Sequence, residues 1–567
     1  MPLICIILLV VNRFMEKITY KKGVRSGAAL IIAMLFVMIF AALSVSLVSM
    51  SGTNIQIASN QQKVNQAYSA AQSGLECARR LASSVSLDPT STNTVTDIQA
   101  EKAWTDFRNH IISTNLGGKS LETSPANEIR TQPLKFDSGN STFQIRFYLS
   151  EPNNPRAIKV EVTGRSGEIT RKIGMDMTIQ KDASVLQYAI ASRGRMWITG
   201  DSTIHGDIYS SWNRTDISPF NMTNDSRVEG TINTVLNRED IENAGYFQFE
   251  TLDENGLPMD VNGNPLGTNY EDRFYGPDDE IQGYHKGINY DQLDQSNIPG
   301  MRIGDYDTST YRNGIPSTTV SAADSTISNG ILSRSGVPTV TEYFPHAAGD
   351  YNTRASSGSQ QLTRYVYVGK TLSNIRVSAN THALFQNCVF EGVLYIDCST
   401  SSTWLSNTNN IRFDNCTFKG TIVTNVPTPF NWQRNALYFT GEATFNNQSI
   451  HQEATILAPH FNVDLGNTNP EQSDDNTLKG AIVGGIVDVR GNAQIEGTII
   501  SMFDTSAYSS GFVTNIGATL DDGGSETTEL GDIGTIEITP DPDNMLPSGI
   551  SSRIVIKPKA DTYYEGF

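Results

Sequence analysis

The sequence predicts a mixed fold: a long N-terminal transmembrane α-helix, a small α+β sheet region, and a large all-β, right-handed parallel β-helix with a long loop-rich insertion. Three observations in the 567 residues support this prediction: an uncharged apolar run near the N-terminus, strands with alternating apolar residues, and a short motif that occurs five times further along, four times with glycine at its last position. These features divide the chain into a leader (1–27), a helix (28–80), an α+β region (81–182), a parallel β-helix (183–510) with an insertion at about 211–364, and a C-terminal tail with short strands (511–567).

The overall charge limits the partners of the chain. It contains 42 Lys and Arg against 60 Asp and Glu, which gives a net charge of −18 at pH 7. Proteins that bind nucleic acids carry basic patches, so we expect no nucleic-acid partner. The five cysteines and seven histidines form no CxxC or HExxH motif, and no metal site is therefore predicted from them.

The first element is a helix that can span a membrane. Residues 26–62 contain no Asp, Glu, Lys or Arg, and the run from Ala28 to Met50 is almost wholly apolar. At about 1.5 Å of rise per residue, this run is roughly 35 Å long, enough to cross a bilayer. The flank before it is basic, and basic flanks stay in the cytoplasm. We therefore expect a single-pass inner-membrane protein whose N-terminus is cytoplasmic and whose bulk is extracytoplasmic; a cleaved secretory signal is the alternative.

The helix is expected to continue beyond the membrane. Small and apolar residues recur at spacings of three and four from Val64 to Ala78, which extends the helix to about Arg80. Upstream, the run Pro2–Val10 is too short to span a bilayer. This favours translation from Met15 over Met1, although both starts remain open.

The N-terminal region resembles a known family. A short basic leader ends in Gly27 and is followed by AALIIAMLFVMIF and, after a polar stretch, by NQAYSAAQSGLECARR. This order is similar to the N-terminus of type IV pilin-like proteins, specifically PilX-type minor pilins and the K-type minor pseudopilin of type II secretion. The resemblance implies that a prepilin peptidase cuts after Gly27 and leaves Ala28 as the first residue, with Gly23 as a second candidate. It also implies other pilins and the pilus assembly machinery as partners.

One position departs from the usual pilin pattern. Most pilins carry Glu at the fifth mature position, where this chain has Ile32. K-type and some PilX-type members also lack this Glu, and the departure argues against a major, polymer-forming subunit. An ordinary single-span anchor is the alternative to the pilin interpretation, because membrane helices rich in small residues are common.

The α+β region is predicted from local patterns. Trp104, Phe107 and Ile111 share one face of a short helix, and Thr96 and Gln99 have the spacing of a capping box. Alternating apolar residues then mark strands and a hairpin turn at 143–149, 158–162, 165–168 and 173–179. A long helix followed by an antiparallel sheet is the arrangement of a pilin head; a generic α+β linker domain is the alternative.

The recurring motif consists of an apolar residue, one polar residue and usually a glycine. The last position is occupied by Gly206, Gly392, Gly420, Asn447 and Gly497. The exchange of Gly for Asn indicates a left-handed backbone turn. Spacings of 28 and 27 residues after Gly392 suit the coils of a parallel β-helix.

Residues at equal positions in the coils are expected to stack. The motif predicts an interior ladder of Phe390, Phe418 and Phe445. Cys388 and Cys416 are then expected on neighbouring coils about 4.8 Å apart. Two buried thiols are favoured over a disulfide, because stacked positions rarely have the dihedral angle that a disulfide needs. The final coils, LKGAIVGGIVDVRGNAQIEGTIIS, resemble the rungs of bactofilin-like polymer-forming β-helices.

No catalytic, cofactor-binding or metal site is predicted. Asp253 and Asp260 lie in an oxygen-rich stretch that offers a weak calcium candidate, but self-bonded Asx turns explain it better. Parallel β-helices also carry polysaccharide lyases and hydrolases, which need paired carboxylates. Asp397, Asp414 and Asp488 are scattered relative to the repeat, so an enzyme is not expected.

These observations predict a non-enzymatic type IV pilin-like protein, a minor pilin with a role in pilus assembly. Its helix would enter the membrane or a pilus, and its β-helical head would serve tip assembly or adhesion at the pilus or cell surface. One alternative is a membrane-anchored β-helix that binds or cleaves polysaccharide, which aromatics along an outer groove would favour. The other is a self-polymerising envelope scaffold, which uncapped end rungs would favour.

Overall fold

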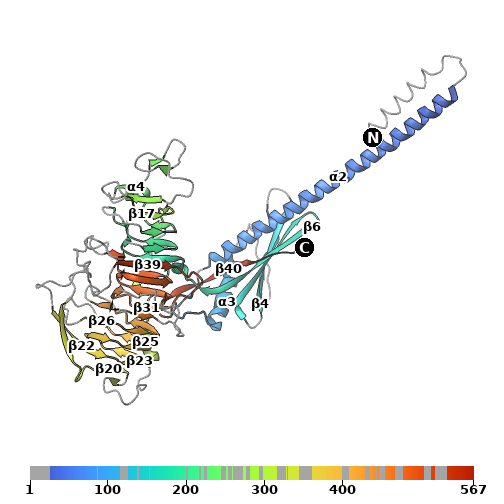
Figure 1. Ribbon diagram of the computed structural model, residues 1–567. Coiled ribbons are helices and arrows are strands. Elements are labelled where there is room, and N and C mark those ends of the chain that lie inside the picture. The colour runs from blue at the N-terminus through green and yellow to red at the C-terminus, as the bar shows by residue number, and fades with distance from the viewer. Residues whose placement is uncertain are drawn as a thin grey trace.

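The computed structural model describes residues 26–566, apart from a set of internal segments. It consists of a long helix, an antiparallel sheet against that helix, and a stack of parallel sheets (Figure 1). The segments outside the description, together with both chain ends, are 1–25, 86, 115, 117–125, 137–139, 152–153, 199–201, 216–218, 223–225, 244–250, 253–257, 260–271, 276–280, 293–297, 316–326, 329, 344–360, 399–407, 428–434, 442, 446–453, 466–476, 504–512, 518–532 and 567.

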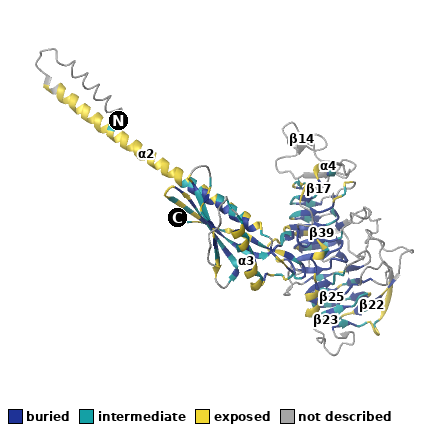
Figure 2. Ribbon diagram, turned by 180° about the vertical axis from the view of Figure 1, so that it is seen from behind, coloured by how far each residue is buried: buried dark blue, intermediate teal, exposed yellow. Residues whose placement is uncertain are grey.

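The long helix is α2 (Ser26–Ser83), which has 58 residues. Its first part is rich in Ala, Leu and Met, which favour helix, and it ends where the Ser83 hydroxyl donates to the Arg80 carbonyl at 3.0 Å. The predicted long apolar helix is confirmed, and it ends three residues beyond Arg80. Figure 2 shows that its N-terminal half is exposed, whereas its C-terminal half is partly buried against the sheet.

Small residues allow α2 to approach the sheet closely. Ala67, Ala71 and Ala78 are fully buried on its inner face. A Cβ added at Gly164 of the sheet would lie 2.0 Å from the carbonyl oxygen of Ala67, and one added at Gly74 of the helix would lie 2.5 Å from Val162 Cγ1. The stripe of small residues that continues the helical pattern is therefore a packing surface.

The antiparallel sheet has the strand order β1-β40-β6-β5-β4-β2, and β3 also pairs with β4. The helix α3 (Asp97–Ser113) packs on the same face as α2, through Trp104 and Phe107, and begins with the predicted capping box of Thr96 and Gln99. The predicted hairpin turn is confirmed, with Gly167 at φ +60°. The strands are β1 (Pro89–Thr90), β2 (Glu128–Arg130), β3 (Leu134–Lys135), β4 (Thr142–Glu151), β5 (Asn154–Ser166), β6 (Ile169–Lys181) and β40 (Ser552–Gly566).

The last strand differs from the expected tail with short strands at 511–567. β40 has 15 residues and pairs antiparallel with β6, so that Ile556 lies opposite Ile179. Ile554 and Ile556 alternate toward the core that α2 and α3 cover, which explains why this segment forms a strand of this sheet. Because β6 and β40 are neighbours, residues 182–551 form an insertion within the antiparallel sheet (Figure 1).

The inserted region contains three largely parallel sheets, here called the first, second and third sheet. The first sheet contains, in spatial order, β18 (Ile288–Asn289), β13 (Ile232–Thr234), β10 (Asp207–Ser210), β7 (Tyr188–Ser192), β37 (Ile499–Ser501), β34 (Ala481–Gly484), β31 (Ala454–Leu457), β28 (Thr421–Thr424), β25 (Val389–Ile396), β23 (Thr371–Val377), β20 (Ile331–Leu332) and β19 (Ile327–Ser328). In addition, β27 (Thr417–Phe418) pairs with β25, and β30 (Thr444–Phe445) pairs with β27.

The other two sheets follow the same course. The second sheet contains β11 (Phe220–Met222), β8 (Arg195–Ile198), β38 (Val513–Ile516), β35 (Val487–Val489), β32 (Asn462–Leu465), β29 (Ala436–Thr440), β26 (Asn410–Asp414), β24 (His382–Gln386), β22 (Gln361–Val368) and β21 (Thr339–Tyr343). The third sheet contains β16 (Asp272–Tyr275), β17 (Ile281–His285), β12 (Arg227–Val228), β9 (Ser202–Ile204), β39 (Ile533–Thr539), β36 (Gly491–Glu496) and β33 (Leu478–Lys479).

The chain passes from sheet to sheet, and one such passage is called a coil. The last coil, β37-β38-β39, stacks on the first coil, β7-β8-β9, with Ile499 beside Ile190 and Ile538 beside Ile204. Two runs of coils therefore meet in the middle of the stack. This arrangement brings the entry from β6 and the exit to β40 to the same place.

The expected loop-rich insertion at about 211–364 is in part further coils. β11, β12 and β13 continue the stack beyond the first coil, and β17 and β18 add to it. The chain then returns to the other end of the stack, and residues 298–315 lie on the outer face of the first sheet. Met301 is fully buried there, and Thr308 Oγ1 donates to the Thr424 carbonyl at 2.6 Å. Short irregular elements connect these parts: η1 (Ser184–Gln187), α4 (Arg238–Asn243), β14 (Thr251–Leu252), β15 (Pro258–Met259), η3 (Ile303–Asp305) and α5 (Ser309–Gly314).

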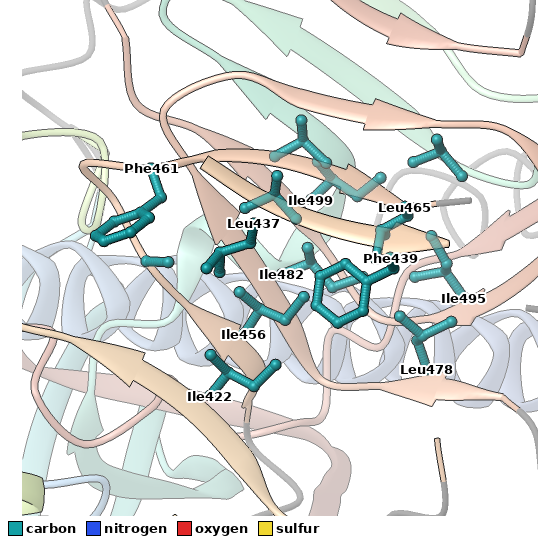
Figure 3. Close-up of a cluster of buried hydrophobic side chains, with 14 of the residues drawn as sticks. Ile422, Leu437, Phe439, Ile456, Phe461, Leu465, Leu478, Ile482, Ile495 and Ile499 are labelled. Atoms are coloured by element: carbon teal, nitrogen blue, oxygen red, sulfur yellow. The ribbon is translucent and has the colours of Figure 1, made fainter. Parts of the chain in front are cut away.

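The space between the three sheets is filled by apolar side chains, one row per strand position. Figure 3 shows Ile422, Ile456, Ile482 and Ile499 of the first sheet facing residues of the second and third sheets. The predicted ladder is confirmed, because the rings of Phe390, Phe418 and Phe445 stack at centroid distances of 5.1 and 5.0 Å. A second ladder runs beside it and consists of Tyr367, Phe385, Phe413 and Phe439.

Glycine is required at the motif positions mainly because the neighbouring coils leave no space for a Cβ atom. Gly392 has φ +71°, as a left-handed turn demands, but a Cβ added at Gly420 would lie 1.7 Å from the Gly392 carbonyl oxygen. The expectation of a left-handed turn at every motif position is thus wrong for Gly206 and Gly420, neither of which has a positive φ. At Gly420, the backbone of the neighbouring coil is the reason for glycine. Left-handed residues form a separate column at Asn387, Asn415 and Gly441. Asn447 lies outside the described residues.

The two stacked cysteines are free thiols. Cys388 and Cys416 are each 1% exposed, and the Sγ atoms lie 3.4 Å from the carbonyl oxygens of Tyr367 and Phe385, respectively. The favoured interpretation as buried thiols agrees with this geometry.

A buried histidine predicts how the stability of the coils depends on pH. Nε2 of His460 donates to the Pro427 carbonyl at 3.0 Å, and burial lowers the pKa of His460 to about 4. The unfolded chain, with a His pKa near 6.5, therefore binds the proton first as the pH falls. The stabilisation is complete above about pH 6.5 and is lost between about pH 6.5 and 4, up to about 3 kcal/mol.

We expect the urea midpoint of the chain to fall between pH 7.5 and pH 5, and His460→Asn to remove most of this change. His110→Gln, at the end of α3, is the control. An equal pH dependence in His460→Asn would contradict the assignment.

Candidate assembly helix and processing site

The exposed half of α2 is the largest apolar surface of the described chain. Leu30, Phe36 and Phe40 are 48%, 56% and 64% exposed, and large apolar residues on every side of the helix are exposed as far as Ile57. The span Ala29–Ser83 contains a window of mean hydropathy 2.8 that is not buried within the protein. Monomeric soluble proteins rarely expose such a surface, so this half of the helix requires a lipid or protein environment.

The expected processing site lies at the start of this helix. Gly27 and Ala28 are in the first turn of α2, and a Cβ added at Gly27 would contact nothing within 4 Å. Ile32 is 55% exposed one turn later. Gly23 lies outside the described residues. The site is therefore at the end of α2 that lies away from the sheet and the coils (Figure 1).

Polar contacts fix the other half of α2 to the sheet. The Tyr68 hydroxyl donates to Glu565 Oε1 of β40 at 2.7 Å, and the Ser166 hydroxyl donates to Gln66 Oε1 at 2.9 Å. Together with the buried alanines, these contacts hold the C-terminal half in one orientation. The N-terminal half then projects as an extension of a helix that is anchored at one end.

The outer face of the first sheet is covered. Tyr188, Tyr209 and Tyr395 on this face are buried together with Met301 and Tyr306 of the returning segment. These aromatic residues are packed against protein and do not line an open groove.

The described ends of the stack carry antiparallel strands. β19 pairs antiparallel with β20, β21 with β22, and β16 with β17. An antiparallel hairpin at the edge of a parallel sheet interrupts the pattern that a further coil would continue.

The acidic residues singled out in the sequence have different surroundings. Asp397 accepts from Arg376 Nε at 2.5 Å, and Asp414 accepts from Gln386 at 3.2 Å, so both serve contacts between coils. Asp488 instead stacks beside Asp464 on the neighbouring coil. This pair was not predicted from the sequence. The segments VDLG (463–466) and VDVR (487–490) are similar in sequence, and this similarity could have indicated equivalent strands.

The described part of the chain contains no cluster of three or more His, Cys, Asp or Glu side chains placed to hold a metal. The weak calcium candidate at Asp253 and Asp260 lies outside the described residues. His205 pairs with Glu229 at 2.8 Å.

Comparison with known proteins supports the interpretation of the helix. Residues 26–76 match the family described as PilX N-terminal. Among solved structures, the chain is similar to the competence-associated pilin ComZ from Thermus thermophilus, with 14% sequence identity, 89% of this chain and 97% of that chain covered, and a TM-score of 0.23. At that TM-score the superposition does not establish a common fold. No curated protein matches the chain.

The matched segment coincides with the exposed apolar helix and its anchored continuation. The N-terminal region is thus similar to that of PilX-type pilin-like proteins, and an apolar helix at this place is typical of the membrane anchoring of pilins. Pilin-like proteins are typically non-enzymatic and act with the partners of pilus assembly.

Proposed function

We propose that this chain, whose first helix matches the PilX N-terminal family, is a non-enzymatic minor pilin that is processed after Gly27 and displays a large head outside the cell. The observation that carries the proposal is the uncharged, exposed half of α2, which has Gly27 in its first turn and projects from the sheet. Such a helix is stable in a bilayer, and after extraction it is stable among the helices of other pilins.

The head is best explained as a right-handed parallel β-helix inserted between β6 and β40. Three facts support this: the chain visits the sheets in turn, equal positions of successive coils are in register, and the interior is filled by ladders of like side chains. Each coil adds strands to neighbouring sheets and places one layer of apolar side chains in the core, as in repeat proteins.

The size of the head supports a place at the pilus tip. Residues 182–551 leave the pilin-like sheet at one point and extend beyond it on the side away from the membrane helix (Figure 1). In a helical filament, every subunit is surrounded by neighbours along the helix, and an insertion of this size would collide with them. Ile32 at the fifth mature position also agrees with a minor subunit.

Two alternative functions are less well supported. Self-polymerisation through the ends of the stack is opposed by the antiparallel strands at β19, β21 and β16. Binding or cleavage of polysaccharide lacks an open aromatic groove on the first sheet, where the tyrosines are covered. Surface polysaccharide remains a candidate target of adhesion by the head.

Processing at Gly27 tests the proposal directly. In cells with their prepilin peptidase, we expect N-terminal sequencing and intact mass to give a mature chain that begins at Ala28. Gly27→Val is expected to leave the chain uncut, and because no atom lies within 4 Å of the added Cβ, the substitution leaves the fold intact. Gly52→Val, at an equally open position of α2, is the matched control and should be processed normally.

The same measurement can overturn the proposal. A wild-type chain that starts at Met1 or Met15 in the presence of the peptidase would contradict processing and identify a plain membrane anchor. If Gly27→Val is cleaved at an unchanged rate and the new N-terminus follows Gly23, the processing site is at Gly23 and not at Gly27.

A further inference from the structure

A row of polar side chains crosses the outer face of the second sheet. In register on neighbouring coils lie Arg412 of β26, Tyr438 of β29, Asp464 of β32 and Asp488 of β35, and Asn515 of β38 follows. Neighbouring parallel strands are about 4.8 Å apart, and residues in register point to the same side. The two carboxyl groups therefore lie side by side, with the Tyr438 side chain in the adjacent position.

These side chains are buried. Tyr438 is 3% exposed, and Asp464 and Asp488 are each 1% exposed. Burying a carboxylate without partners costs several kcal/mol, and two carboxylates side by side add mutual repulsion. Polar groups in such a position need compensation from hydrogen bonds, a proton or a bound ion.

Hydrogen bonds within the described part of the chain do not provide this compensation. Oδ1 of Asp488 accepts from the backbone N–H of Asn515 at 3.1 Å. The other Asp488 oxygen, both Asp464 oxygens and the Tyr438 hydroxyl have no hydrogen-bond partner among the described residues. Four oxygen atoms, from three side chains on three successive coils, thus lack a hydrogen-bond partner among the described residues.

Charged side chains of neighbouring strands lie close to this row. Burial raises the pKa of both Asp464 and Asp488, and repulsion from Asp488 raises the pKa of Asp464 further. The positive charge of Arg490, next to the end of β35, acts in the opposite direction on both carboxyl groups. Arg364 of β22 lies over the Tyr438 ring, 5.9 Å from its centroid. Burial raises the pKa of Tyr438, whose hydroxyl is therefore a neutral oxygen at physiological pH.

Two kinds of compensation remain, a proton or a cation. A single shared proton joins one oxygen of Asp464 to one of Asp488. It leaves the second Asp464 oxygen and the Tyr438 hydroxyl without a partner. A cation beside the row can take oxygen ligands from all three side chains, and Ca²⁺ accepts 6–8 oxygen ligands in irregular geometry.

We propose that Asp464 and Asp488, with the hydroxyl of Tyr438, bind one Ca²⁺ ion that links three neighbouring coils of the second sheet. The two carboxylates supply the charge, and the tyrosine supplies a neutral oxygen. The remaining ligands are water or other oxygens. This site is separate from the Asp253 and Asp260 stretch and does not depend on the function proposed for the helix.

Calcium binding by the full-length chain tests the site. The detergent-purified protein is stripped with EDTA and dialysed against CaCl₂, and bound calcium per chain and the melting temperature are measured. We expect calcium to raise the melting temperature by several degrees. Asp464→Asn and Asp488→Asn should each bind one equivalent less, with affinity at this site reduced by about 100-fold or more.

Two further variants make the test specific. Asp414→Asn changes an outward carboxylate of the same sheet outside this row and should bind as much calcium as the wild type. Tyr438→Phe removes one oxygen and keeps the ring, so it should weaken calcium binding while the EDTA-treated protein remains folded. This variant keeps the test decisive if an Asp→Asn variant does not fold.

Three results would overturn the proposal. The first is a wild-type chain that binds no calcium at millimolar concentration. The second is an Asp464→Asn variant that binds as many equivalents as Asp414→Asn. The third is a wild type whose stability does not change with calcium but decreases as the pH rises, while the stability of Asp464→Asn does not decrease with pH. This result would identify a shared proton in place of a cation.

Discussion

A chain that ends at Ser551 is expected not to accumulate as folded protein, although it lacks only the final strand. β40 pairs with β6 along most of its length and places Ile554 and Ile556 in the core beneath α2 and α3, where they are 3% and 4% exposed. Burial of these two side chains contributes about 3–6 kcal/mol. This is a large part of the roughly 5–15 kcal/mol that stabilises a domain.

The loss of β40 has a second effect, on the connection between the two parts. The coils are joined to the antiparallel sheet through the adjacent ends of β6 and β40, where Arg553 pairs with Asp182 at 2.9 Å and Lys181 donates to the Pro547 carbonyl at 3.1 Å. Without β40, the coils are connected to the antiparallel sheet only through β6. The hydrogen-bonding edge of β6 is then unpaired, and an unpaired strand edge promotes aggregation.

The measurement is the yield and protease resistance of the full chain and the truncated chain in membrane extracts. A chain that lacks only Phe567 and a Lys557→Ala variant, which changes an exposed side chain of β40, serve as controls and should match the wild type. If the chain ending at Ser551 accumulates to the wild-type yield and resists protease equally well, β40 does not close the sheet as described.

Elements with a local signal could be predicted from the sequence. The helix follows from an uncharged apolar run, α3 from its capping box and its apolar face, and the hairpin from alternation around Gly167. The ladder of Phe390, Phe418 and Phe445 was predictable because each coil repeats the same spacing. The second ladder had the same signal, since Phe385, Phe413 and Phe439 recur at spacings of 28 and 26 residues.

Features that depend on distant pairing could not be predicted in the same way. The apolar alternation of β40 shows that it is a strand but not that its partner is β6, more than 370 residues earlier. The stacking of the last coil on the first is equally absent from local patterns, because any coil of this repeat can stack on any other. The juxtaposition of Asp464 and Asp488 depends on a register between coils whose connection carries no motif.

Gly420→Ala is expected to destabilise the head more than an exposed glycine substitution elsewhere. The added Cβ would lie 1.7 Å from the carbonyl oxygen and 2.5 Å from the carbonyl carbon of Gly392. Both atoms belong to the backbone of a coil that is held in place by hydrogen bonds, such as that from Lys419 N–H to the Phe390 carbonyl at 2.8 Å. Neither side can move without breaking these bonds or separating the phenylalanine ladder, and overpacking of this kind costs about 3 kcal/mol or more.

Urea unfolding, followed by the fluorescence of the tryptophans, measures this cost. Trp212 is fully buried in the coils, whereas Trp104 lies in the core beneath α2. Gly304→Ala is the matched control, because the Cβ added there meets no atom within 4 Å, and its midpoint should stay within error of the wild type. Since each coil contacts only its neighbours, the damage from Gly420→Ala should begin in the coils and spare the antiparallel sheet. An unchanged midpoint for Gly420→Ala would show that the coils are further apart than the register of β25 and β28 requires, and the glycine of the motif would then need another explanation.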